Sequence, residues 1–267
     1  MLNSSNLGAE IHAKAIEELL ALARGGLWSD GPPPALTALA DLSFDESLRL
    51  QLDVLAAWEA QGERLGGWKI GLTSRGARDS MGAGVRPHGY ILAGRILDGG
   101  SQLDAQVPNA RLEPEIAVTL GADLSGPDVT VEQARAAVES VAPAFEINSS
   151  RVPKGSSLAI RLGNSLNNWG LVIGAPQDPA SVDLGDLRVS IGNERGAVDA
   201  GHSGPETLDD PYLSLARVCR SLAQNGRGLS AGQRLITGSL TAAVPLDEAR
   251  SFYADFGALG RVTLDIA

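Results

Sequence analysis

The spacing of hydrophobic residues divides the chain into two parts. Over residues 7–24, and again after Ser43, apolar residues recur every three or four positions, as they do along one face of a helix. The sequence SFDE at residues 43–46 has the form of a capping box, which predicts that the second helix begins there. We therefore expect residues 1–65 to form an N-terminal helical layer.

From Gly66 onward the pattern changes to short apolar runs separated by glycines, which is typical of strands joined by loops. Two more helices are expected, one from Thr130 through Val141 and one over residues 211–225. A hairpin is expected around Gly192 and Asn193. The other strand candidates are residues 68–72, 90–97, 113–120, 144–147, 170–173, 234–237, 251–256 and 260–266. The pattern predicts an α+β fold, with residues 66–267 as a strand-rich body.

Two glutamates one residue apart are the most informative polar positions. Glu113 and Glu115 lie in a predicted strand, where alternate side chains point to the same face. A third acid, Glu146, follows beyond the predicted helix of residues 130–141. Three carboxylates brought together repel one another, and a divalent cation offsets this repulsion. The pattern indicates a metal site, although two glutamates spaced in this way, taken by themselves, more often lie on a solvated strand face.

Two further observations favour the metal site. The three acids lie beside apolar runs, where an unpaired carboxylate is unfavourable. Pro114 has no N–H to donate to a sheet, so it predicts a sheet edge or a bulge between the first two glutamates. Bulges often redirect side chains near functional sites.

Composition and charge exclude several classes of partner. The chain has 22 Lys and Arg against 32 Asp and Glu, a formal charge of −10, and no basic cluster, so nucleic acid and anionic membrane surfaces are poor partners. The single cysteine, Cys219, excludes an intrachain disulfide. No run approaches the roughly 18 apolar residues of a membrane span, and residues 1–20 lack a secretory pattern. We expect a cytoplasmic protein.

Four motifs carry a family resemblance. They are GWKIGLTS at residues 67–74, EPE at 113–115, PAFE at 143–146 followed by Ser150 and Arg151, and LITG at 235–238. In this order they resemble the 2-keto-4-pentenoate hydratase and 4-oxalocrotonate decarboxylase family, which belongs to the fumarylacetoacetate hydrolase superfamily. The similarity covers most of the chain. It implies rolled sheets forming a barrel-like β body with helices outside, and usually a homo-oligomer.

The resemblance also implies a set of site residues. The metal ligands for Mg²⁺ or Mn²⁺ would be three carboxylates, those of Glu113, Glu115 and Glu146. Lys69 resembles the active-site lysine, which would either anchor the substrate carboxylate or move protons. Burial would lower the pKa of Lys69 toward that of a useful base, whereas the acids would raise it. Thr237 and Gly238 resemble a turn that holds substrate, because a glycine permits close approach of the backbone.

The sequence departs from the family pattern at two places. His88 stands where many relatives have an aspartate, and it could perform acid–base chemistry near neutral pH or be a loop residue without a catalytic part. Residues 163–165 read GNS where relatives often show ADN. The glycine-rich stretch of residues 76–89 lacks the ending of a phosphate loop, so a mobile lid over the metal is the better interpretation.

The chemistry expected of such a site follows from a 2-oxo acid, whose carboxylate and keto oxygens chelate one divalent ion. The ion acts as a Lewis acid and stabilises an enolate. We expect hydration of a 2-hydroxydienoate first and decarboxylation of a 2-oxo-enedioate second, with acylpyruvate-type carbon–carbon hydrolysis third. The competing class is a protein that binds metal and a 2-oxo acid without turnover.

Overall fold

Three helices precede the first strand, and the sequence predicts the two longer ones; the short helix between them is not predicted. The computed structural model describes residues 4–28, 31–74, 76–104, 107–246 and 249–267. Helices α1 (Ser4–Ala23), α2 (Pro34–Ala38) and α3 (Phe44–Ala60) come before β1. The capping box of α3 is formed, because the Ser43 side chain accepts from the Glu46 N–H and the Glu46 carboxylate accepts from the Ser43 N–H at 2.9 Å. A domain boundary at residue 65 stays a prediction.

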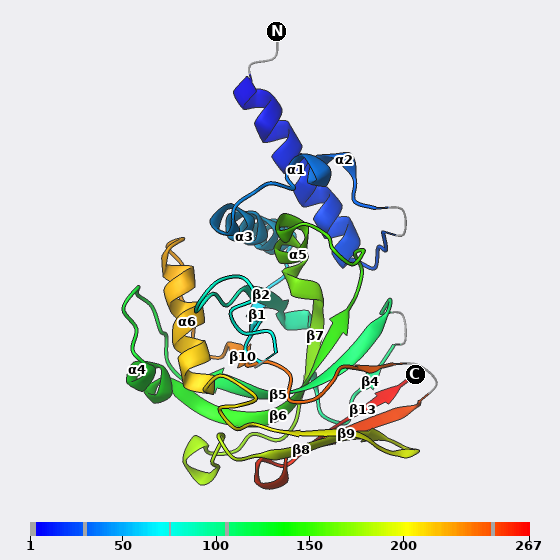
Figure 1. The fold of residues 1–267 in the computed structure, drawn as a ribbon, viewed down its shortest axis with the longest axis vertical. Coiled ribbons are helices and arrows are strands. Elements are labelled where there is room, and N and C mark those ends of the chain that lie inside the picture. The colour runs from blue at the N-terminus through cyan, green and yellow to red at the C-terminus, as the bar shows by residue number, and fades with distance from the viewer. Residues whose placement is uncertain (1–3, 29–30, 75, 105–106, 247–248) are drawn as a thin grey trace.

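The larger sheet is rolled. Its strands are β1 (Leu65–Ile70), β2 (His88–Leu92), β3 (Ile96–Asp98), β5 (Ala110–Leu120), β6 (Val138–Ser149), β7 (Asn168–Ile173), β10 (Arg234–Ile236) and β11 (Val244–Pro245). Their order is β2-β1-β10-β5-β6-β7-β3, and β11 pairs with β5. The end strands β2 and β3 are joined only by the short turn η1 (Ala93–Arg95), so the two edges of the sheet must approach each other (Figure 1).

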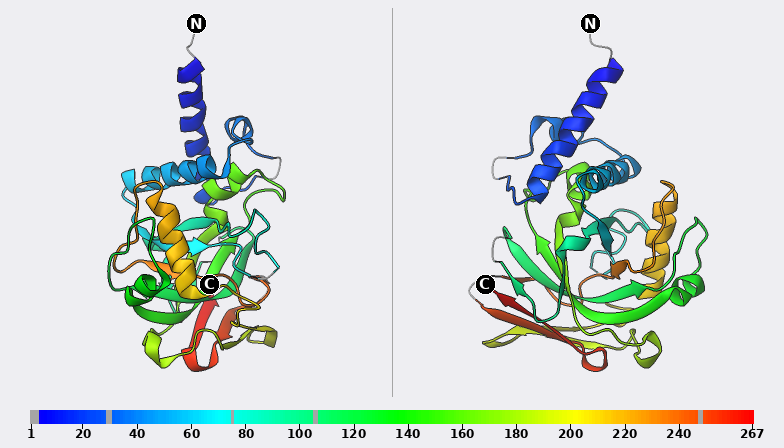
Figure 2. Two further views of the ribbon diagram at one scale, coloured as in Figure 1. Left: turned by 60° about the vertical axis from the view of Figure 1, so that its left-hand side comes forward. Right: turned by 180° about the vertical axis from the view of Figure 1, so that it is seen from behind.

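The expected α+β fold is confirmed, with an open roll in place of a closed barrel. In the described part of the chain, β2 and β3 do not pair with each other. A second sheet has the order β4-β13-β12-β8-β9 and packs beneath β6 (Figure 2). Its strands are β4 (Gln102–Leu103), β8 (Arg188–Asn193), β9 (Gly196–His202), β12 (Ser251–Asp255) and β13 (Arg261–Ile266). Strands β8 and β9 form the predicted hairpin.

The helices of the body differ in part from the prediction. Helix α6 (Pro211–Ala223) is where the sequence predicts it, and it packs against α4 (Val131–Ala136). The helix expected through Val141 is wrong beyond Ala136, because Val138 already belongs to β6 and pairs with Leu120. Pairing along the whole length of β5 outweighs a helical spacing of apolar residues that fits both structures. Helix α5 (Leu158–Gly163) is not predicted.

The expectation of a sheet edge or a bulge at Pro114 is also wrong. Strand β5 pairs with β6 along one side and with β10 and β11 along the other, and its register shift lies near Leu120. The carbonyl of Pro114 accepts from the N–H of Leu240 at 3.0 Å, between the ends of β10 and β11. The N and O atoms of one residue face the same neighbour in an antiparallel strand. The missing donor of Pro114 therefore falls in the gap between two partner strands.

No helix among the described residues is both long enough and apolar enough to cross a lipid bilayer.

Candidate active site

Strand pairing brings the three predicted glutamates together. Glu113 of β5 lies directly opposite Glu146 of β6, and Glu115 follows two positions along on the same face. One carboxylate oxygen of each residue lies within 4.8 Å of the other two. Glu115 and Glu146 are buried. The sheet thus builds a cluster of oxygen ligands, the type that Mg²⁺ and Mn²⁺ prefer.

The electrostatics of the cluster favour a bound cation. Burial, and then the charge of Glu146, raise the pKa of Glu113 to about 7. The same two causes, in the same order, raise the pKa of Glu115 well above its usual range. A divalent ion offsets the repulsion that produces part of these shifts. The residues present therefore fit a hard divalent metal ion.

Lys69 points at this cluster from β1. Lys69 lies opposite Ile236 of β10, and Ile236 in turn lies opposite Ala117 of β5. Ala117 is two positions from Glu115 and so shares its face of the sheet. The Nζ of Lys69 donates to both carboxylate oxygens of Glu146, at 2.6 and 2.8 Å, and to the carbonyl of Leu166 at 3.4 Å. Burial lowers the pKa of Lys69, but Glu146 and the other carboxylates raise it more, so the net pKa is above its usual value. Lys69 is a cation in this arrangement and not a free base.

The turn after β10 supplies a backbone donor. The N–H of Gly238 donates to Oε2 of Glu115 at 2.6 Å. Gly238 has a φ of +110°, and a Cβ built there would lie 1.9 Å from Oγ1 of Thr73, so only glycine fits without a shift. The hydroxyl of Thr237 is fully buried and donates to the carbonyl of Ile116 at 3.3 Å. Gly238 therefore reaches the site directly, whereas Thr237 bonds within the sheet.

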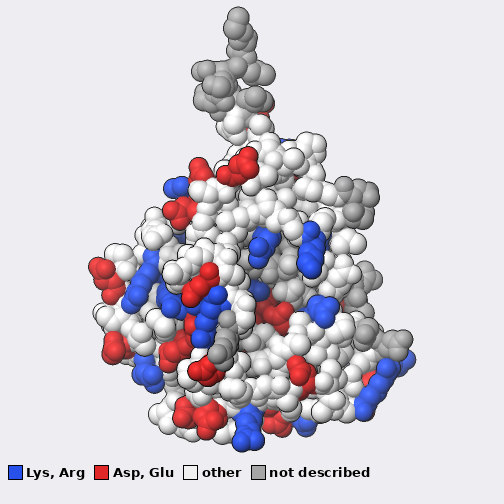
Figure 3. All heavy atoms as spheres, in the orientation of Figure 1, with Lys and Arg blue, Asp and Glu red and all other residues white. Residues whose placement is uncertain are grey.

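A cavity of about 360 Å³ opens over the carboxylates. Its walls come from Lys69 and the following residues 70–74, from Gly238, and from residues 166–167. Figure 3 shows acidic atoms recessed in a hollow near the middle of this face, with Lys and Arg side chains beside it. Two polar lining residues, Asn148 and Arg161, are not predicted from the sequence. Asn148 lies two positions after Glu146, so strand alternation could have indicated it.

Relatives of the chain are known. A 4-oxalocrotonate decarboxylase from Pseudomonas sp is 33% identical over 232 residues, which cover 86% of this chain and 90% of that protein. A 2-hydroxypent-2,4-dienoate hydratase from Pseudomonas putida is 34% identical over 193 residues, 70% of this chain and 85% of that protein. The chain belongs to the 2-keto-4-pentenoate hydratase and 4-oxalocrotonate decarboxylase family. The resemblance carried by the four motifs is thus confirmed, while no protein-family model matches the chain.

Solved structures share the fold of this family member. The 4-oxalocrotonate decarboxylase from Pseudomonas putida G7, complexed with magnesium and adipate, superposes with a TM-score of 0.84 at 23% identity, covering 96% of this chain and 98% of that one. A fumarylpyruvate hydrolase from Pseudomonas aeruginosa, in complex with Mn²⁺ and pyruvate, gives a TM-score of 0.54 at 16% identity over 75% of this chain and 88% of that one. The fold is that of the fumarylacetoacetate hydrolase superfamily.

His88 does not join the site of this family member. It pairs with Ile70, the neighbour of Lys69 along β1, and so points to the opposite face of the sheet. There its Nε2 lies 3.2 Å from Oγ of Ser221, and its ring packs edge-on against Trp68 at 5.3 Å. Burial lowers the pKa of His88 to about 4. The placement corresponds to a neutral packed side chain, so the acid–base role expected from the sequence has no geometric support.

Residues 163–165, the second place where the sequence departs from the family pattern, lead into a strained turn beside the cavity. Ser165, Leu166 and Asn167 have φ values of +50°, +52° and +65°, a region that residues other than glycine rarely adopt. Such residues cost about 1–3 kcal/mol each and persist where the surroundings fix them. Here the Ser165 hydroxyl donates to the carbonyl of Tyr90 at 2.7 Å, and Nδ2 of Asn164 donates to Oδ1 of Asn167 at 2.8 Å. Asn164 and Ser165 therefore shape the wall of the cavity.

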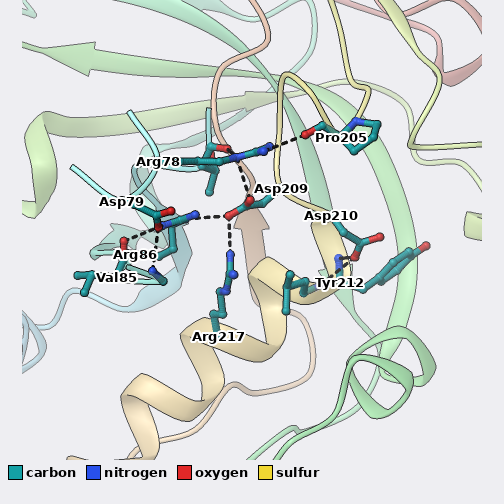
Figure 4. A network of polar contacts seen from close by, with 12 residues as sticks. Arg78, Asp79, Val85, Arg86, Pro205, Asp209, Asp210, Tyr212 and Arg217 are labelled. Atoms are coloured by element: carbon teal, nitrogen blue, oxygen red, sulfur yellow. Dashed lines mark hydrogen bonds and ion pairs between the residues drawn. The ribbon is translucent and has the colours of Figure 1, made fainter. Parts of the chain in front are cut away.

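A partly buried ion-pair network anchors the glycine-rich loop between β1 and β2. Asp209 accepts hydrogen bonds from Arg86 at 2.8 Å and from Arg217, and it pairs with Arg78 at 3.0 Å (Figure 4). Arg78 also donates to the carbonyl of Thr73, which lines the cavity. The network thus fixes the loop beside the carboxylates, in the place expected for a lid. Its mobility stays a prediction.

Proposed function

We propose that this protein is a divalent-metal-dependent lyase that acts on a small unsaturated 2-oxo acid and hydrates a 2-hydroxydienoate. The observation that carries the proposal is the convergence of Glu113, Glu115 and Glu146 within 4.8 Å at the base of a cavity. The family relatives include both hydratases and decarboxylases. Decarboxylation of a 2-oxo-enedioate is the second candidate, because Arg161 adds a cation to the same cavity.

The chain's residues would bind and orient the substrate. Mg²⁺ or Mn²⁺, held by the three carboxylates, would supply Lewis-acid stabilisation of the negative charge that develops on the keto oxygen. The Lys69 ammonium would attract the substrate carboxylate. Among the charged groups that line the cavity in the described residues, Lys69 is the only one besides the carboxylates that can exchange a proton, because arginine keeps its own. We propose that it positions Glu146 and moves a proton at the carbon skeleton.

Apolar side chains beneath the carboxylates would exclude water that competes for the charged groups of the site. Small and branched apolar side chains cluster on the face that carries the carboxylates, and they are fully or almost fully buried: Ile91, Ala117, Ala142, Ala144, Leu171 and Ile236. A low-dielectric floor strengthens the electrostatic interactions above it. The short alanine side chains also leave volume for the metal and the chelating end of a substrate.

Metal titration tests the carboxylate assignment. Protein freed of metal with a chelator is titrated calorimetrically with Mg²⁺ and with Mn²⁺, and a single site per chain is expected. Glu146→Gln should abolish this binding, because it removes a charged ligand. Glu139→Gln is the matched control, since Glu139 is exposed on the same strand. Unchanged binding in Glu146→Gln would refute the metal site.

Turnover is followed by loss of dienol absorbance alongside release of CO₂, with 2-hydroxydienoates and 2-oxo-enedioates as substrates. Water addition without CO₂ supports the hydratase, and CO₂ release supports the decarboxylase. Binding of oxalate without any turnover would contradict both. Lys69→Met should abolish turnover while the protein still binds metal.

The proposal includes a homo-oligomer in the cytoplasm. The outward half of α1 stands clear of the body in two views, which leaves it available to a second copy (Figures 1 and 2). Light scattering coupled to gel filtration measures the subunit number. A monomer at micromolar concentration would contradict this part of the proposal.

A further inference from the structure

Two neighbouring cavities meet at Arg161. The first is the cavity over the carboxylates, and the second, of about 530 Å³, is lined by residues 150 and 152–156. Arg161 and Asn167 line both. Lys154 adds a second cation to the outer cavity. A ligand that begins at the metal site and extends past Asn167 therefore encounters two positive charges.

The Arg161 side chain has no partner among the residues that the structure describes. Arg86 and Arg217, which line neither cavity, both bond to Asp209. By contrast, no hydrogen bond or ion pair joins the guanidinium of Arg161, or the ammonium of Lys154, to any residue that the structure describes. Arginine presents planar donors that match a carboxylate in two parallel hydrogen bonds. Arg161 is thus placed and free to bind an anion.

The charges that line the two cavities favour a ligand with two negative charges. The described lining residues carry three carboxylates and three cations, namely Lys69, Arg161 and Lys154, so they sum to zero. A bound divalent ion adds two positive charges. A 2-oxo acid with one carboxylate leaves one of these charges uncompensated, whereas a dicarboxylate compensates both. Excess charge of one sign in a partly enclosed site favours ligands of the opposite charge.

We propose that Arg161, with Lys154 behind it, forms a subsite for a distal carboxylate, so that the substrate is a 2-oxo dicarboxylate. The inference rests on the proposed function, because that function places the 2-oxo end at the metal. It applies equally to hydration and to decarboxylation of such an acid. Asn148 lies two strand positions beyond Glu146, about 6.6 Å along β6, and lines the path between the two ends.

Binding of two matched, unreactive acids tests the subsite. The probes are 2-oxoadipate and 2-oxohexanoate, which share a six-carbon chain and the 2-oxo end but differ in the distal carboxylate. Their affinities are measured calorimetrically with excess Mg²⁺. Wild-type protein should bind 2-oxoadipate at least about ten-fold more tightly, the effect of one charge-assisted hydrogen-bonded pair.

Variants assign the preference to its residues. Arg161→Met should abolish the preference for 2-oxoadipate and leave the affinity for 2-oxohexanoate unchanged. Lys154→Met should reduce the preference by a smaller factor, because Lys154 lines only the outer cavity. Arg49→Met is the charge-matched control, since Arg49 is exposed on α3 and lines neither cavity. Circular dichroism and thermal melts verify that each variant folds.

The outcomes separate the inference from the function beneath it. Equal affinity of wild-type protein for the two acids would overturn the distal subsite and leave the metal-dependent function standing. A preference that survives in Arg161→Met would overturn the assignment to Arg161. If neither acid binds in the presence of Mg²⁺, the proposed function itself fails.

Discussion

Replacing Gly238 by alanine is expected to disturb the fold and the site together. The residue has a φ of +110°, and its N–H donates to Glu115 at 2.6 Å. A Cβ would lie 1.9 Å from Oγ1 of Thr73, far inside van der Waals contact. Thr73 is buried at the edge of the cavity, so the contact can be relieved only by moving its side chain or the turn toward the carboxylates. The substitution must therefore displace the turn, the threonine or both.

Three effects add to the loss of stability. The left-handed backbone costs about 1–2 kcal/mol with a side chain. Overpacking against Thr73 costs about 1–3 kcal/mol. Displacing the turn also weakens a hydrogen bond to a buried carboxylate, worth about 1.5–3 kcal/mol. Gly238→Ala should lower the free energy of unfolding by about 2.5–7.5 kcal/mol, after a gain of about 0.4–1 kcal/mol from the stiffer unfolded chain is included.

The assay is urea denaturation in the presence of a chelator, with calorimetric Mg²⁺ titration alongside. Gly232→Ala is the matched control, because Gly232 has a φ of +83° but no atom within 4 Å of the built Cβ. It should lose only about 1 kcal/mol, the backbone part alone. The double variant Gly238→Ala with Thr73→Ala should recover the overpacking part, about 1–3 kcal/mol.

Two results would refute this reasoning. Equal losses in Gly238→Ala and Gly232→Ala would show that the approach to Thr73 does not matter. A double variant no more stable than Gly238→Ala would show that the loss does not come from that contact. A lower Mg²⁺ affinity in Gly238→Ala, absent in Gly232→Ala, links the turn to the carboxylate that it orients.

Three other predictions follow from the site. In urea denaturation of chelator-treated protein, Lys69→Met should lower the free energy of unfolding by about 3–5 kcal/mol, because it leaves Glu146 buried without its cation. Mg²⁺ should restore part of this loss. Lys154→Met, at an exposed lysine, is the control. The pKa of Glu113 is raised from 4.5 to about 7 in the folded state, so between these values folded protein holds a proton that unfolded protein has lost. Metal-free protein should therefore lose stability as pH rises through about 7. Thermal melts across this pH range measure the loss, and bound Mg²⁺ should remove it. Asp209→Asn removes the carboxylate charge that three arginines share, so trypsin should cut the loop before β2 faster while Mg²⁺ affinity stays unchanged; equal cleavage would contradict the anchoring role.

Part of the site could be predicted from local pattern alone. Alternation along a strand is a property of the backbone, so the shared face of Glu113 and Glu115 follows from their spacing. The partnership of Glu113 with Glu146 depends on register between two strands, and register is set by turns and burial elsewhere in the chain. The resemblance to the family supplied this part.

The remaining differences have the same cause. The face on which His88 lies depends on which residue of β1 it opposes, and a shift by one residue would have placed it beside Lys69. Arg161 lies on a six-residue helix, which is too short to give a periodic signal. The spacing of Val138 and Val141 fits a helix as well as a strand, and only the partner strand decides between them.

The position of β10 in the larger sheet has a consequence for biosynthesis. It lies between β1 and β5, so it joins the strand that carries Lys69 to the strand that carries two of the glutamates. On the ribosome, β1 and β5 emerge long before Arg234, and they must wait for it without their common neighbour. Contacts of such long sequence separation form slowly. A nascent chain that lacks β10 can therefore pair β5 with β6, but it lacks the strand that fixes Lys69 beside the glutamates.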